Sequence, residues 1–190
     1  MKELFSARVG ETAKLIAQLD SGSLPERINA AIDVLADALK ARCPVLVCGN
    51  GGSSSDAMHI AGELVGRFLV ERPAYNVLAL SANTSVLTAW SNDCTYDTVF
   101  SRQVEAHGQS GGILWGISTS GNSVNVLHAL ETANALGMTT IGLTGEGGGR
   151  MAQLCDVLID VPSYETPRIQ EMHVVVYHFI CEQLESLLSV

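Results

Sequence analysis

The sequence predicts a single α/β domain built on a five-stranded parallel sheet, and three observations support this prediction. Short apolar runs look like strands buried on both faces, helix-period segments lie between several of them, and glycine-rich turns join the two. This alternation is typical of right-handed crossover units, in which helices cover both faces of a parallel sheet. The expected strands are 45–49, 76–80, 113–118, 139–145 and 157–162.

Helices are expected before, between and after these strands. The last one, at about 168–188, carries the run VVVYHFI and is apolar around most of its circumference, so it must be buried on several sides. Part of its surface is expected to meet another subunit, which predicts an obligate oligomer. Pro25 suits the first turn of the second helix. The remaining helices are expected at about 2–19, 25–41, 53–69, 84–107 (in pieces) and 123–137.

Length and composition indicate one domain over 1–190, with the N-terminal helices over about 2–41 and the sheet and C-terminal helix over about 45–190. Of the residues, 47% are hydrophobic and 16% charged, as in a well-buried globular protein. A net charge of −9 without any lysine or arginine run argues against a nucleic-acid partner. No apolar run is long enough to span a membrane, and the first residues do not resemble a secretory signal. The five cysteines form no C-x-x-C pair and indicate reduced thiols, so we expect a cytoplasmic protein.

Two glycine- and serine-rich junctions stand where ligands of such sheets bind, beyond the carboxyl ends of the strands. They are GNGGSSS at 49–55 and STSGNS at 118–123. Free backbone N–H groups at a helix N-terminus favour an anion, and serine hydroxyls add donors. Neither junction continues into Gly-Lys-Ser/Thr, and Ser54 stands where a dinucleotide fingerprint needs its last glycine. Each loop alone is also typical of ordinary turn and N-cap residues, but the pair favours one phosphate on a small metabolite.

His59 and Glu63 lie four residues apart on the helix after the first loop and therefore share a face. Imidazole and carboxylate suit zinc or another divalent ion, and they also suit general acid–base work. The alternative is a helix with one polar histidine and one solvated glutamate.

The last helix carries a second set of polar residues. Gln170 and His178 are eight residues apart and could reach one site obliquely. A histidine in an apolar run such as VVVYHFI is more often a hydrogen-bonded core residue, so that alternative stays open for His178. His173 lies on a different azimuth and is expected to be structural, whereas His107 and His128 are expected at the surface.

Four separated motifs together resemble the phosphoheptose isomerases, which are sugar-isomerase (SIS) domain enzymes. The motifs are GNGGSSSDAMHIAGELVGRF from residue 49, SND at 91–93, STSGNS at 118–123 and TPRIQEMH…H at 166–178. The resemblance spans essentially the whole chain and implies one SIS domain of flavodoxin- or Rossmann-like topology. It implies an aldose–ketose isomerase that converts sedoheptulose 7-phosphate to D-glycero-D-manno-heptose 7-phosphate, the first step of ADP- or GDP-heptose synthesis for lipopolysaccharide or capsule. It also implies a homotetramer with active sites near subunit contacts.

The resemblance further implies roles for individual residues. Glu63 and His178 match the two acid–base positions, and we expect Glu63 to carry the carbon-bound proton and His178 the oxygen-bound one. Because a zinc-bound group is a poorer base, either the substrate displaces a ligand or the metal mainly organises the site. One zinc ion per subunit is expected at His59, Glu63, Gln170 and His178. The substrate-binding positions are Asn50, Gly51, Gly52, Glu63, Asn92, Asp93, Ser118, Thr119, Ser120, Ser123 and Gln170.

A non-catalytic SIS-domain protein that binds the bacterial replication initiator is the alternative function. Such proteins retain much of the glycine loop and the RIQEMH segment, but they typically lack the pair that corresponds to Glu63 and His178. A sugar-phosphate-sensing regulator would need a DNA-binding extension, for which we expect no spare residues. The isomerase is therefore favoured.

Overall fold

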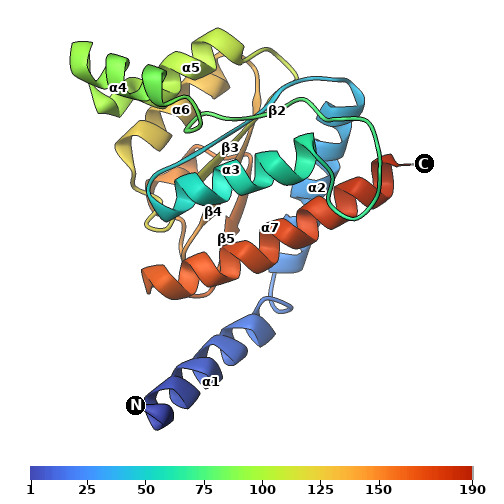
Figure 1. Cartoon of the computed structure of the whole chain (residues 1–190), viewed down its shortest axis with the longest axis vertical. Helices are drawn as coiled ribbons and strands as arrows, with labels where there is room; N and C mark the ends of the chain where they lie inside the picture. The colour runs from blue at the N-terminus through green and yellow to red at the C-terminus, as the bar shows by residue number, and fades with distance from the viewer. Residues whose placement is uncertain (190) are drawn as a thin grey trace.

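The computed structural model describes residues 1–189 and contains, in that range, one sheet of five parallel strands (Figure 1). The strand order is β2-β1-β3-β4-β5, so the chain starts one strand in from an edge, adds β2 at that edge and then builds outward on the other side through β3, β4 and β5. Register pairs such as Val45 with Ile113 align β1 with β3. This confirms the predicted α/β fold and parallel sheet. The strands are β1 (Val45–Gly49), β2 (Val77–Ala79), β3 (Ile113–Ser118), β4 (Thr139–Thr144) and β5 (Val157–Asp160).

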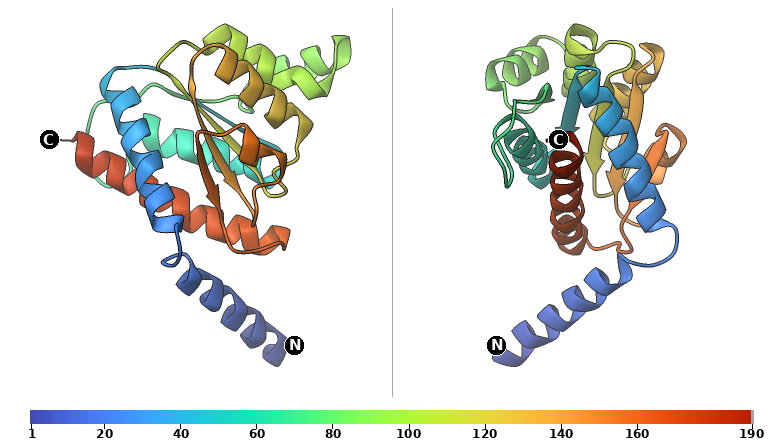
Figure 2. Two further views of the ribbon diagram at one scale, coloured as in Figure 1. Left: turned by 180° about the vertical axis from the view of Figure 1, so that it is seen from behind. Right: turned by 90° about the vertical axis from the view of Figure 1, so that its right-hand side faces the viewer.

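Helices cover both faces of the sheet (Figure 2). Residues of α2, α3 and α7 form one apolar core with alternate strand residues such as Val47 and Trp115, while α5 and α6 form a second core against Leu46 and Leu114. β1 and β3 are buried over their full length, as expected for strands with helices on both sides. The helices are α1 (Lys2–Gln18), α2 (Leu24–Lys40), α3 (Gly52–Val65), α4 (Thr84–Asp93), α5 (Val99–His107), α6 (Val124–Ala135) and α7 (Thr166–Leu188), with short 3-10 helices at Tyr96–Thr98 and Gly149–Gln153.

The expected helix at 53–69 was too long at its C-terminal end. α3 ends at Val65, and the chain then runs in irregular form to β2. The buried guanidinium of Arg72 caps the helix by donating hydrogen bonds to the carbonyl oxygens of Glu63 (2.7 Å), Leu64 (2.9 Å) and Gly66 (3.3 Å). These carbonyls would otherwise lack intrahelical partners. The apolar residues that follow Gly66 continue the helical pattern in the sequence but do not continue the helix.

α1 projects away from the sheet and its covering helices (Figures 1 and 2). Its apolar side chains Leu4 and Phe5 are 75% and 72% exposed. On α7 the outward-facing side chains Val175 and Phe179 are 41% and 44% exposed, although the opposite face of this helix is buried. The apolar circumference of α7 is thus only partly covered within one chain.

Two further sequence expectations concern cysteines and membranes. All five cysteines are free, and Cys48 and Cys181 are buried. Burial, with Cys155 nearby, raises the pKa of the Cys48 thiol to about 12. Among the described residues, no helix combines the length and the apolar character that crossing a membrane requires.

Candidate active site

α3 and α7 lie side by side and run in the same direction, which brings their polar residues into register (Figure 1). At the start of both helices, Gly52 lies against the side-chain amide of Gln170. Seven residues further along α3, His59 contacts Tyr177 and His178 of α7. A site can therefore form along the seam between the two helices.

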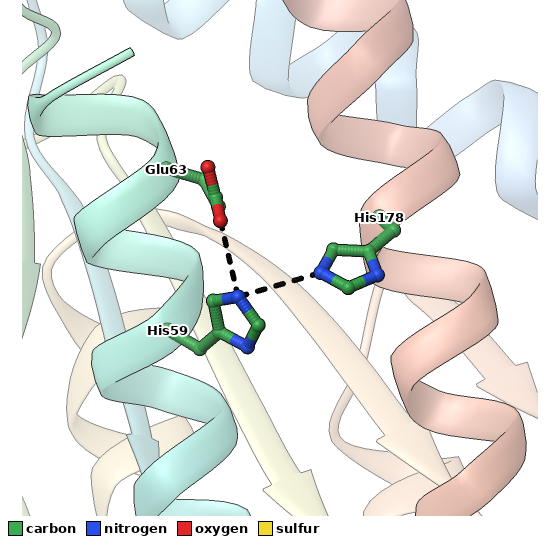
Figure 3. Close-up of side chains that lie close together, drawn as sticks. All are labelled: His59, Glu63 and His178. Atoms are coloured by element: carbon green, nitrogen blue, oxygen red, sulfur yellow. Dashed lines mark hydrogen bonds and ion pairs between the residues drawn. The ribbon is translucent and has the colours of Figure 1, made fainter. Parts of the chain in front are cut away.

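His59, Glu63 and His178 form one cluster in this seam (Figure 3). The Nε2 atom of His59 lies 3.0 Å from Oε1 of Glu63 and 3.4 Å from Nε2 of His178. His59 is exposed and the other two are half-buried. His178 therefore faces the seam, and the alternative of a core histidine is wrong for it. On α7 the preceding Tyr177 points into the core, whereas the half-buried His178 side chain points toward His59 of α3.

The three side chains of the cluster have the ligand types and the spacing that could hold a metal ion. One imidazole N–H of His59 can point at only one of its two neighbours, whereas a cation can accept lone pairs from both imidazoles and the carboxylate together. One ligand atom from each of the three residues lies within 4.8 Å of the others. Two ligands placed 2.0–2.1 Å from a tetrahedral zinc ion are about 3.4 Å apart, close to the observed separations. The donor set of two imidazoles and one carboxylate is one that zinc accepts.

Two buried polar groups stand behind His59. The hydroxyl of Tyr177 lies 2.8 Å from Nδ1 of His59, on the ring edge opposite the cluster. Asp56, one turn earlier on α3, is 8% exposed, and its Oδ2 has no hydrogen-bond partner among the described residues. Burial raises the pKa of Asp56 to about 6, against the opposing charge of His59. Burial, and then the charge of Asp56, raise the pKa of Tyr177.

A buried ion pair closes the far end of the seam. Glu185 of α7 accepts hydrogen bonds from the backbone N–H groups of Phe68 (2.9 Å) and Val70 (3.0 Å) and from Nε of Arg72 (3.1 Å). The side chains of Arg72 and Glu185 are 1% and 3% exposed. This contact holds the segment after α3 against α7 and places the Phe68 ring 5.9 Å from that of His178. Sequence reasoning missed this pair, since nothing local links residues 113 positions apart.

The first glycine loop is held by amide groups. Asn50 and Asn125 exchange two hydrogen bonds, of 2.8 and 2.9 Å, and the hydroxyl of Tyr96 donates to Oδ1 of Asn50 (2.7 Å). Asn125 is buried in the first turn of α6, so it joins the loop after β1 to the helix after the second loop. Sequence reasoning also missed Asn125; its place two residues after STSGNS is the only signal that the sequence offers for it.

The second loop, 118–123, turns tightly between β3 and α6. The hydroxyls of Ser118 and Ser123 lie 2.9 Å apart, and half-buried Thr119 and exposed Ser120 follow Ser118. Gly121 has a φ of +64°, and a Cβ there would stand 2.0 Å from the carbonyl oxygen of Gly148. Only glycine therefore allows this turn to pack so closely against the neighbouring loop.

The remaining expected site residues lie outside the cluster of His59, Glu63 and His178. The side-chain amide of Gln170 lies beside exposed Gly52, where a Cβ would stand 2.1 Å from its Nε2 atom. Gly51 is also exposed, with a φ of +54°. Asn92 and Asp93 lie exposed at the end of α4, where the Asn92 amide donates to the Asp93 carboxylate (2.9 Å). No hydrogen bond in the described part of the chain ties this pair to the cluster.

The histidines expected outside the site behave mostly as expected. His173 is fully buried and donates from Nε2 to the carbonyl oxygen of Thr144 (3.1 Å), so it is structural. Burial lowers the pKa of His173 to about 4, with the Thr144 hydrogen bond acting in the opposite direction. His107 is exposed, whereas His128 is half-buried with Nδ1 3.0 Å from the carbonyl oxygen of Asp97.

Comparisons of the sequence and of the structure with known proteins point to the same family. A family model described as "SIS domain" matches residues 11–145. The phosphoheptose isomerase of a Synechocystis species is 50% identical over 188 residues, which are 99% of this chain and 95% of the relative. That of Rhodospirillum rubrum is 51% identical over 88% of this chain and 89% of the relative. Among solved structures, the phosphoheptose isomerase of Neisseria gonorrhoeae has a TM-score of 0.91 at 38% identity, covering 97% of this chain and 98% of that one. The one from Francisella tularensis has a TM-score of 0.92 at 32% identity, with 97% of both chains covered.

Proposed function

The chain belongs to the phosphoheptose isomerases, a family of SIS-domain proteins, and from this premise we infer its reaction. It is a sugar-phosphate isomerase that interconverts sedoheptulose 7-phosphate and D-glycero-D-manno-heptose 7-phosphate in heptose biosynthesis. The observation that carries the assignment of the site is the convergence of His59, Glu63 and His178 in the seam between α3 and α7.

Ketose–aldose isomerisation moves a proton between C1 and C2 of the sugar through an enediolate, while a second proton passes between O1 and O2. We assign the carbon-bound proton to the Glu63 carboxylate and the oxygen-bound proton to the His178 imidazole, which also helps to open the sugar ring. The two side chains come from different helices but share one cluster, as two groups that act on adjacent atoms must.

We assign a zinc site to the same residues, with His59, Glu63 and His178 as ligands and Gln170 as a fourth. When bound, zinc supplies positive charge near the oxygens of the enediolate. The donor chemistry and spacing of the cluster support the first three ligands. The Gln170 amide lies beside Gly52, seven residues before His59 on α3, so it would have to extend along the seam to reach the cluster.

The two loops are assigned to the rest of the substrate. Backbone N–H groups and hydroxyls of Ser118, Thr119, Ser120 and Ser123 hold the phosphate at the N-terminus of α6. The loop at Asn50, Gly51 and Gly52 contacts the sugar. The two hydrogen bonds between the side-chain amides of Asn50 and buried Asn125 fix the position of this loop relative to the phosphate loop. Asn92 and Asp93, exposed at the end of α4, are assigned to the sugar as well.

We further propose a cytoplasmic homotetramer whose product enters lipopolysaccharide or capsule synthesis. The exposed apolar side chains of projecting α1, such as Phe5, and of α7, such as Phe179, support burial against other copies of the chain. Light scattering after size exclusion tests the tetramer, and Phe5→Ser with Phe179→Ser is expected to shift it to smaller species.

The reaction is tested by following sedoheptulose 7-phosphate by NMR in the presence of zinc. The wild type is expected to form the aldoheptose 7-phosphate, and Glu63→Gln is expected to lower kcat by about 10²–10⁴-fold, the range for loss of a general base. Glu71→Gln, an exposed glutamate beyond the end of α3, is the matched control and should retain wild-type turnover. Absence of turnover in a folded, zinc-loaded wild type would contradict the proposed function and leave the initiator-binding alternative, which the presence of Glu63 and His178 disfavours.

A further inference from the structure

The hydroxyl of Tyr177 contacts His59, a candidate metal ligand, at the ring nitrogen that points away from the cluster. It lies 2.8 Å from Nδ1 of His59, while Nε2 of the same ring faces Glu63 and His178. The tyrosine ring is 1% exposed and meets the His59 ring edge-on, with centroids 5.4 Å apart. Tyr177 also directly precedes His178 on α7, so one turn of this helix supplies both contacts to the site.

The position of the imidazole proton makes this contact important. A neutral imidazole carries a proton on only one of its two nitrogens, and the nitrogen that binds a metal must be unprotonated. If Nε2 of His59 is the ligand atom, Nδ1 carries the proton and needs an acceptor. The Tyr177 hydroxyl is the partner that the structure places there. A hydroxyl can also donate, so it can serve Nδ1 when the ring proton returns to Nε2 in the absence of metal.

We propose that Tyr177 is a positioning residue of this site: its hydroxyl accepts the Nδ1–H of His59 and so turns a bare Nε2 toward the metal. The proposal rests on the zinc site of the proposed function. The aromatic ring alone accounts for the packing of Tyr177 in the core, where phenylalanine would fill almost the same volume. The hydroxyl is the part that acts on the site, because its contact is with the ligand ring.

The test is the zinc affinity of Tyr177→Phe, measured by competition with a chromophoric chelator at pH 7.5. Loss of such an outer contact weakens metal binding by about 10–100-fold, which is the expected result. Tyr75→Phe is the matched control, because its hydroxyl is buried with no hydrogen-bond partner among the described residues and its ring lies against Arg72 rather than against His59. It should bind zinc as the wild type does. Equal affinity of Tyr177→Phe and the wild type would overturn the proposal.

A second measurement needs no variant, and so decides the matter even if Tyr177→Phe folds poorly. In the zinc-loaded wild type, nitrogen-15 NMR of the histidine rings should show a slowly exchanging Nδ1–H on His59, with cross-relaxation to the Tyr177 ring protons. A His59 ring without that proton would refute the assignment. If the wild type binds no zinc, the metal site and this proposal both fail, whereas isomerase turnover without zinc would leave the reaction itself intact.

Discussion

The buried Glu185–Arg72 pair predicts a large loss of stability for a single substitution. The Glu185 carboxylate accepts backbone N–H groups from Phe68, Leu69 and Val70 and the Nε–H of Arg72. Glu185→Gln removes the charge, leaves the guanidinium buried without a counter-ion and turns an amide N–H₂ toward other donors. Removal of one partner from a buried pair costs about 3–5 kcal/mol, a large part of the 5–15 kcal/mol by which such domains are stable.

The loss is measured by urea denaturation of the metal-free protein at pH 7.5 and one fixed protomer concentration, because assembly changes apparent stability. Glu182→Gln, an exposed glutamate on the same helix, is the matched control and should stay within about 0.5 kcal/mol of the wild type. A loss below about 1 kcal/mol for Glu185→Gln would refute the reasoning, since the pair would then not be a buried, mutually dependent contact.

The pH dependence of the same pair follows from its hydrogen bonds. Burial alone would raise the pKa of Glu185, but the N–H groups of Leu69, Phe68 and Val70 and the charge of Arg72 lower it. A carboxyl with a lowered pKa in the folded state binds fewer protons there than in the unfolded chain. Its contribution is therefore present above the ordinary glutamate pKa and is lost as pH falls through the folded value.

Three further predictions concern residues around the site. His173 has a folded pKa of about 4, so folding favours its neutral form and this residue should contribute a loss of stability of about 1.4 kcal/mol per unit as pH drops from about 6.5 to 4. The raised pKa of Asp56 acts in the opposite direction below about pH 6, so the His173 part is measured as the slope of the difference between the wild type and His173→Gln in urea titrations, and no such slope in that difference would refute it. Gly52→Ala should displace the flexible amide of Gln170, raising KM while changing the unfolding free energy by less than about 1 kcal/mol, and an unchanged KM would contradict this placement. Gly121→Ala should cost more than the about 1–2 kcal/mol of a left-handed residue, because its Cβ meets the backbone of Gly148; thermal melts and KM check this, and wild-type values for both would refute it.

Local patterns accounted for most of the fold. Strands β1 and β3 begin and end where their apolar runs do, because burial on both faces leaves no polar position inside them. The i, i+4 spacing of His59 and Glu63 was enough to place both on one face of α3, because helix geometry alone decides it.

Contacts between distant segments could not be predicted in the same way. α3 stops at Val65 although apolar residues follow, because Arg72 caps its carbonyls and Glu185 binds the next N–H groups. The same holds for the Tyr177 hydroxyl, whose contact with His59 spans 118 positions of the sequence. Such contacts depend on how α7 packs on α3, which no periodicity of either segment encodes.

The most direct test of the central claim is turnover of sedoheptulose 7-phosphate by the zinc-loaded protein in heavy water, followed by NMR. We expect aldoheptose 7-phosphate with deuterium at C2, because a proton held by the Glu63 carboxylate can exchange with solvent between its removal from C1 and its delivery to C2. Glu63→Gln should lose both the product and the label. Wild-type levels of labelled product from Glu63→Gln would contradict the role assigned to Glu63, because another group would then carry the proton.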